Sequence, residues 1–209
     1  MTSAKTAACL KVQGTFLEAD ECLKIDESLV YRVAEADLYE LAQFHKRDAN
    51  ELFKRRFFRT AFARYRQAIR FVIIAQQQCQ FNLKLAKEER LSLPEDYDTL
   101  VERLRLCKVQ LLSNLAACQL HSGKYDMVVE NCTKCLKIDR NNVKALFRRG
   151  QAYESLGEAD RAVRDYREAA LLAPDDLSIQ KKMEFVQCVA KQDEISQKKL
   201  AQNLKNLFR

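Results

Sequence analysis

Apolar side chains recur every three or four positions from residue 28 to the end of the chain, as they do along one face of an α-helix. A clear example is the set Leu100, Leu104, Cys107 and Leu111, which would share one face of a helix that begins near Asp98. The chain has only two Pro and four Gly, and 47% of its residues are hydrophobic. This pattern and composition predict a compact, all-α protein.

Two copies of one unit lie next to each other at residues 109–142 and 143–176, offset by 34 positions without a gap. The offset pairs Ala116 with Gly150, Gly123 with Gly157, Val128 with Ala162, Cys132 with Tyr166, and Cys135 with Ala169. A third copy at 42–75 repeats this spacing with Ala49, Ala61, Tyr65 and Ala68. A period of this length marks an array of stacked helix pairs, in which no pair buries its apolar face alone.

An insertion at 76–108 separates the first repeat from the second, because Ala49 and Ala116 are 67 positions apart rather than 34. We expect the insertion to lengthen the two helices beside it, with its tip at Lys87–Asp96, since a structureless loop of that size is unusual in a compact domain. The chain then has three parts: a partly helical lead-in at 1–37, a repeat domain at 38–176, and a helix at 177–209. The last helix should cover the open end of the array.

The net charge of +7 is unevenly distributed. Residues 42–75 hold nine Lys or Arg against Asp48 and Glu51, whereas residues 1–41 hold four Lys or Arg against eight Asp or Glu. A basic first repeat favours acidic partners, although it is also what a basic face in contact with water would look like. No recognition motif accompanies the basic charge, so we expect no nucleic-acid partner.

The repeated unit resembles the tetratricopeptide repeat (TPR). Gly123 and Gly157 end the first helix of their units, and the second helix carries small or aromatic residues at three- and four-residue spacing. The resemblance implies three TPR helix pairs in a right-handed superhelix, followed by a long C-terminal capping helix. The chain looks most like the TPR regions of the large FK-binding-type immunophilins and of the aryl-hydrocarbon-receptor-interacting class. That likeness covers about 38–208 and rests on the Lys-Ala-Leu-Phe-Arg-Arg-Gly run at 144–150, the insertion and the basic final helix.

Those relatives carry a prolyl-isomerase domain upstream of the repeats, and residues 1–37 are too short for one. We therefore expect a non-enzymatic, immunophilin-like adaptor. The alternative is a vestigial isomerase region within residues 1–40. Two residues depart from the family pattern: Ala49 stands where Gly is usual, and His45 where a large aromatic residue is common.

Polar residues mark the first helix of each unit, the helix that lines the concave groove of a TPR array. Lys46 and Asn50 are four positions apart and so share a helix face, as do Lys144 and Arg148, and Asn114 lies in the matching region of the second repeat. Lys and Arg supply charge and hydrogen-bond donors for a carboxylate, and Asn amides supply donors without adding charge.

In co-chaperone TPR domains, residues of this kind form a carboxylate clamp. The resemblance therefore implies that the chain binds the acidic C-terminal tail of heat-shock protein 90 or 70 and links it to a client that the sequence does not name. Phe53, one turn beyond Asn50, would line an apolar sub-pocket beside the clamp or belong to the core. The alternative is a general scaffold that binds internal peptides, with these residues idle.

The basic second half of the final helix has two interpretations: a projecting helix surrounded by water, or a docking helix for calmodulin or another acidic groove. Cys132-x-x-Cys135 falls at core positions of the repeat, and neither His45 nor His121 has triad partners, so we expect no metal, cofactor or catalytic site. The chain has no apolar run long enough for a membrane span and no signal peptide. We therefore expect the protein in a reducing compartment, either the cytoplasm alone or the cytoplasm and the nucleus. Its eight Cys should then be free thiols.

Overall fold

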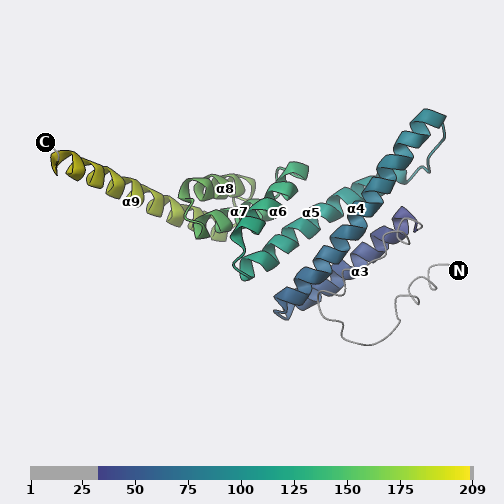
Figure 1. Ribbon diagram of the computed structural model, residues 1–209, viewed down its shortest axis with the longest axis horizontal. Helices are drawn as coiled ribbons and strands as arrows, with labels where there is room; N and C mark the ends of the chain where they lie inside the picture. Colours follow the sequence, from purple (N-terminus) through teal and green to yellow (C-terminus); the bar gives the residue numbers. More distant parts are fainter. Residues whose placement is uncertain (1–32, 208–209) are drawn as a thin grey trace.

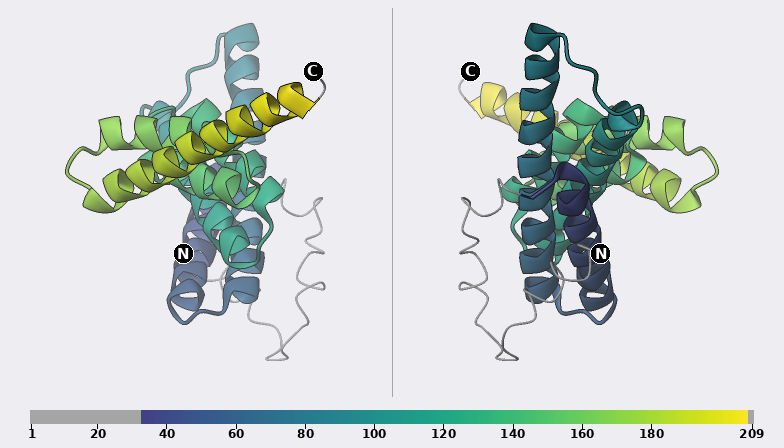
Figure 2. Two further views of the ribbon diagram at one scale, coloured as in Figure 1. Left: turned by 90° about the vertical axis from the view of Figure 1, so that its left-hand side faces the viewer. Right: turned by 90° about the vertical axis from the view of Figure 1, so that its right-hand side faces the viewer.

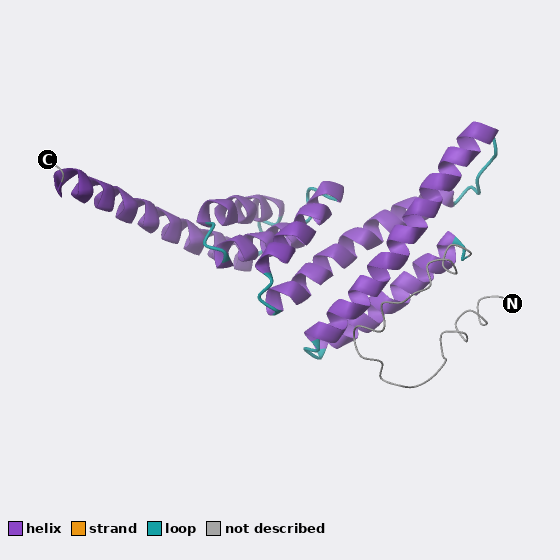
Figure 3. Cartoon of the chain, viewed as in Figure 1, coloured by secondary structure: helices purple, strands orange, loops and turns teal. Residues whose placement is uncertain are grey.

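The computed structural model describes residues 33–207, and every regular element in that range is an α-helix (Figure 3). The expectations for residues 1–32 lie outside the described part of the chain. The helices are α3 (Glu35–Lys54), α4 (Phe58–Glu89), α5 (Tyr97–His121), α6 (Tyr125–Ile138), α7 (Val143–Ser155), α8 (Ala159–Leu172) and α9 (Leu177–Leu207). This order confirms the predicted all-α fold.

The helices stack in pairs in chain order, and the molecule is elongated (Figure 1). α3 packs on α4, α5 on α6 and α7 on α8, and each pair packs on the next. The first helices of the pairs also touch one another, because α5 contacts both α3 and α7. We call the surface formed by α3, α5 and α7 the A-helix face. α9 packs on α8 through buried Ile179 and Val186, and its far half then runs free of the other helices with Leu200 and Leu204 exposed (Figure 1).

The insertion lies almost entirely in helix: α4 and α5 run past the rest of their pairs and are joined by residues 90–96. In both views of Figure 2 the far end of α4 stands clear of the neighbouring helices. Glu35, at the start of α3, holds the base of this extension. Its Oε1 accepts hydrogen bonds from Asn82 Nδ2 at 2.5 Å and from the Tyr97 hydroxyl at 3.2 Å. One carboxylate thus ties α3, α4 and α5 together.

Close packing within a pair requires a small residue on the first helix. A Cβ built on Gly150 would lie 2.8, 3.0 and 3.1 Å from ring atoms of Tyr166 in α8. The matching residues of the other repeats are Ala49 and Ala116, both fully buried. Larger side chains here would push the two helices apart, which explains why this position is the clearest mark of the repeat.

The turn inside each pair needs a left-handed residue. Gly123 and Gly157 supply it with φ of +66° and +78°. In the first repeat the matching residue is Arg56, which adopts φ of +65° despite its Cβ. A non-glycine residue in this conformation costs about 1–2 kcal/mol, so the packing of α3 on α4 must compensate for it.

A charged pair within the third repeat also reaches the second repeat. The guanidinium of Arg149 donates to both carboxylate oxygens of buried Asp165, at 2.7 and 2.8 Å, and also to the hydroxyl of Thr133 at 3.3 Å. Two parallel bonds of this kind fix geometry as well as distance. α6, α7 and α8 are therefore held in one register.

Replacing Gly150 with Ala should destabilise the protein by about 1–3 kcal/mol, because the added methyl group would overlap the Tyr166 ring. Chemical denaturation would measure the change. On an ordinary exposed helix the same replacement raises stability by about 0.5–1 kcal/mol. An increase in stability would therefore show that the contact between α7 and α8 is looser than the structure indicates.

Stability should also depend on pH through His45, which is 8% exposed and stacks on Phe71 with ring centroids 5.5 Å apart. The pKa of His45 is lowered from 6.5 to about 4, mainly by burial and also by the charge of Arg64, while Asp48 opposes the shift. The pKa of His45 is lower in the folded protein than in the unfolded chain. As the pH falls, the unfolded chain therefore binds the proton at a higher pH than the folded protein does, and this favours unfolding. Stability is then complete above about pH 6.5 and falls by up to about 3 kcal/mol as the pH drops towards 4.

Unfolding of the wild type and His45→Phe proteins between pH 7 and 5 would test this dependence. The His45→Phe protein should lose part of the pH dependence, since phenylalanine keeps the ring stack and does not titrate. Identical slopes for the two proteins would contradict the assignment.

Candidate peptide-binding surface

The A-helix face carries all six residues that the sequence singled out: Lys46, Asn50 and Phe53 on α3, Asn114 on α5, and Lys144 and Arg148 on α7. α5 is the middle helix of this face and contacts both of the others. Side chains from α3 and α7 therefore reach towards α5 from its two sides.

The α3 side of the face is a connected polar network. The Lys46 ammonium donates to Gln110 Oε1 at 2.8 Å, which joins α3 to α5. One turn further along each helix, Asn114 Nδ2 donates to Asn50 Oδ1 at 3.3 Å. The same Asn50 oxygen accepts a hydrogen bond of 2.6 Å from the Tyr65 hydroxyl on α4. Hydrogen bonds thus link Lys46 and Asn50 on α3 to Gln110 and Asn114 on α5.

On the other side, α7 supplies a half-buried arginine. Arg148 Nη1 donates to the backbone carbonyl of Ser113 at 2.9 Å and also to the Ser113 hydroxyl. Burial lowers the pKa of Arg148, but a guanidinium stays charged at neutral pH. The cation is therefore held in place against α5 before any ligand arrives.

Lys144 differs from the other cations. It is exposed, one turn before Arg148 on α7, and it forms no hydrogen bond or ion pair with any residue in 33–207. Its ammonium is free to follow a ligand on the A-helix face. The described residues also hold no ion pair between an acidic side chain and Lys46 or Arg148, so the positive charge of the face is not neutralised.

Phe53 takes part in an aromatic cluster at the end of α3. Its ring lies 5.2 Å from that of Phe58 and 5.6 Å from that of His121, and these two rings stack at 4.0 Å. The residue is half-buried and packs against the core of the first two repeats. Phe53 therefore has a structural contact, and its remaining exposed surface is what a ligand could touch.

Three contributors to this surface had no sequence signal of their own: Tyr65, Gln110 and Ser113. Tyr65 matches the core Tyr166 of the third repeat, so the pattern marked it only as core. Gln110 and Ser113 are polar residues on a helix that is otherwise apolar around them. A closer look at spacing could have found Gln110, because it lies one helical turn before Asn114.

The structure places both thiols of the Cys132-x-x-Cys135 pair in the core, fully buried. Burial raises the pKa of Cys132 to about 12 and that of Cys135 to about 11. Within the described residues there is no group of three or more His, Cys, Asp or Glu arranged for a metal ion. Nor does any helix in that range have the length and apolar character needed to cross a membrane.

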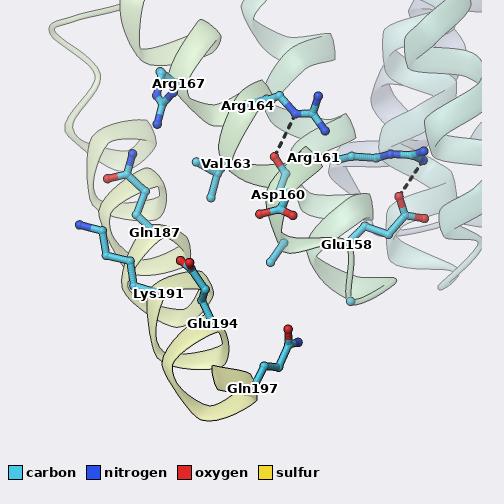
Figure 4. Close-up of a pocket in the computed structure, with 12 residues that line it drawn as sticks. Glu158, Asp160, Arg161, Val163, Arg164, Arg167, Gln187, Lys191, Glu194 and Gln197 are labelled. Atoms are coloured by element: carbon cyan, nitrogen blue, oxygen red, sulfur yellow. Dashed lines mark hydrogen bonds and ion pairs between the residues drawn. The ribbon is translucent and has the colours of Figure 1, made fainter. Parts of the chain in front are cut away.

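A hollow of about 980 Å³ lies between α8 and α9, away from the A-helix face (Figure 4). Its charged lining residues have both signs: Glu158, Asp160, Arg161, Arg164, Arg167, Lys191 and Glu194. Arg161 is paired with Glu158 at 2.7 Å, and Arg164 donates to the Asp160 carbonyl at 3.2 Å. With four basic and three acidic side chains, the charges of this hollow nearly balance, unlike those of Lys46, Lys144 and Arg148 on the A-helix face.

Known proteins share this architecture. Residues 143–176 match the family model of the tetratricopeptide repeat. The C-terminal TPR-containing domain of an FK506-binding protein of Plasmodium falciparum superposes with a TM-score of 0.63 at 26% identity, covering 80% of this chain and 99% of that one. The chain therefore has the fold of a TPR domain, and its residues 143–176 are a tetratricopeptide repeat.

Two further proteins are similar to this chain, one in sequence and one in structure. A segment of 96 residues, 46% of this chain, is 35% identical to the peptidyl-prolyl cis-trans isomerase FKBP42 of Arabidopsis thaliana. The match covers 26% of that protein, so the chain spans about a quarter of its relative. The myosin chaperone UNC-45 of C. elegans, solved with a Hsp90 peptide, superposes with a TM-score of 0.53 at 27% identity, over 75% of this chain and 14% of that one.

The buried thiols give a prediction for reactivity. The thiolate is the reactive form of a cysteine. At pH 8 about one molecule in ten thousand should carry a thiolate at Cys132, and about one in a thousand at Cys135. Mass spectrometry after iodoacetamide treatment should find the exposed Cys188 labelled and these two unlabelled until the protein unfolds. Rapid labelling of Cys132 in the folded protein would contradict its place in the core.

Proposed function

We propose that this protein is a non-catalytic TPR adaptor whose A-helix face binds the acidic C-terminal tail of heat-shock protein 90 or 70. The observation that carries the proposal is the positive charge on that face: Lys46 and Arg148 are bonded to α5, and exposed Lys144 lies one turn before Arg148 on α7. None of the three pairs with an acidic side chain among the described residues. The likeness to UNC-45, whose structure holds a Hsp90 peptide, supports the same class of ligand.

The chemistry of such a tail fits the face. A chain that ends in Asp carries two carboxylates on its last residue, and only a free C-terminus supplies both. The ammonium groups and the guanidinium provide charge-assisted donors, each contributing about 1.5–3 kcal/mol. The amides of Asn50 and Asn114 add donors with no further charge. After the cost of ordering a flexible peptide, a few such bonds give micromolar affinity, about −8 kcal/mol.

Two other functions make different predictions. A scaffold for internal peptide segments would bind equally well with or without a free C-terminal carboxylate. A vestigial isomerase would accelerate the cis–trans conversion of a proline-containing peptide. The unneutralised cations on the A-helix face favour the adaptor, because a site for neutral internal segments needs no such charge.

Fluorescence anisotropy with a labelled peptide ending in Glu-Glu-Val-Asp would test the proposal. Micromolar binding is expected for the free acid, and at least ten-fold weaker binding for the C-terminal amide, because amidation removes one charge and one acceptor. Added salt should weaken the binding of the free acid, since the face is exposed. Equal binding of the two peptides would overturn the adaptor function and favour the scaffold.

Lys144→Ala is the sharpest variant, because this side chain is exposed and supports no other residue in the described chain. It should weaken binding of the free acid by about ten-fold, equivalent to about 1.4 kcal/mol. Lys137→Ala is the matched control: Lys137 is an exposed lysine on α6, which lies outside the A-helix face. An equal effect of the two changes would mean that only the overall charge of the protein matters.

A further inference from the structure

The Tyr65 hydroxyl is directed at the A-helix face rather than at the core around its ring. The residue lies on α4 and is 2% exposed. Its hydroxyl donates to Asn50 Oδ1 at 2.6 Å, the shortest hydrogen bond that reaches the predicted site residues on α3. Burial raises the pKa of Tyr65 to about 12, so the hydroxyl keeps its proton and remains a donor at neutral pH.

This bond decides which way the Asn50 amide faces. Asn50 Oδ1 accepts from Tyr65 and, at 3.3 Å, from Asn114 Nδ2. With the amide turned over, the Tyr65 hydroxyl and Asn114 Nδ2 would both lose the oxygen that they share as acceptor in the observed orientation. In the observed orientation the oxygen is directed at these two residues. Asn50 Nδ2 then lies on the opposite side of the amide and donates to none of the described residues.

The other repeats show that this arrangement is a property of the first repeat rather than of the fold. The matching residue of the third repeat, Tyr166, is also buried, but its hydroxyl donates to Glu154 Oε2 at 2.9 Å. Glu154 in turn pairs with Lys182 of α9 at 2.8 Å. In the second repeat the position is Cys132, which has no hydroxyl. Only the first-repeat tyrosine reaches a residue of the proposed clamp.

We propose that Tyr65 is a positioning residue of the tail-binding site: its hydroxyl holds the Asn50 amide so that the NH₂ group is preset to donate to the carboxylate of the bound peptide. This inference rests on the proposed function for its ligand, and on the hydrogen-bond geometry for its mechanism. An amide that is already oriented loses less conformational freedom when the ligand binds, which raises affinity without a new contact to the ligand.

Tyr65→Phe removes the hydroxyl and keeps the ring that fills the core. We expect this variant to bind the free-acid Glu-Glu-Val-Asp peptide about five- to ten-fold more weakly than the wild type, the usual effect of losing one hydrogen bond. Tyr166→Phe is the matched control, since it removes a buried hydroxyl from the same repeat position, and its affinity should equal that of the wild type. The Tyr65→Phe change should have no further effect in an Asn50→Ala background, because the group that it orients is then absent.

An NMR measurement without peptide tests the orientation separately. The side-chain NH₂ resonances of Asn50 should shift in Tyr65→Phe and stay in place in Tyr166→Phe; unchanged resonances in both variants would overturn the inference. If the wild type binds the peptide and Tyr65→Phe binds it equally well, the inference fails and the proposed function stands. If the wild type does not bind, the proposed function fails, and the resonances alone decide whether Tyr65 orients the amide.

Discussion

Each helix pair in this protein has apolar surface that it cannot cover by itself, and the whole molecule follows from how the pairs cover one another. Close approach within a pair depends on one small residue, seen most plainly where Gly150 faces the Tyr166 ring. Where that contact is close, the first helices of successive pairs can also meet, with α5 touching both α3 and α7. The A-helix face exists because of this packing.

Since the second helices and the inter-pair contacts bury most of the apolar surface, the A-helix face is free to carry polar residues. Several of these polar residues are held by hydrogen bonds to neighbouring helices. Arg148 is fixed by Ser113, Lys46 by Gln110, and Asn50 by Tyr65 and Asn114. Of the cations predicted for the site, Lys144 is the one that is exposed and has no such support from the described residues. A face with three held groups and one adaptable cation combines low ordering cost with room to adjust to a ligand.

The first repeat departs from the other two in several linked ways. It has Arg56 where the others have glycine at the same left-handed turn, and a buried His45 stacked on Phe71. Its Tyr65 hydroxyl donates to Asn50, whereas the hydroxyl of the matching Tyr166 in the third repeat donates to Glu154. The left-handed conformation of Arg56 costs conformational energy at the turn. The hydrogen bond from Tyr65 to Asn50 adds order on the A-helix face. Repeats that share a backbone can thus differ in purpose through the partners of a few side chains.

The sequence alone determined the helical repeats, their register and the residue types of the site, because period and residue size are local properties that the chain displays directly. The 34-residue offset located the helix pairs, and four-residue spacing put Lys46 with Asn50 and Lys144 with Arg148. The tertiary structure decided which residue each of these side chains hydrogen-bonds to. Tyr65 and Tyr166 are equivalent in sequence, yet one hydroxyl bonds Asn50 on α3 and the other Glu154 on α7. Hydrogen bonds between helices depend on distances and directions set by packing, and no periodicity along one helix records them.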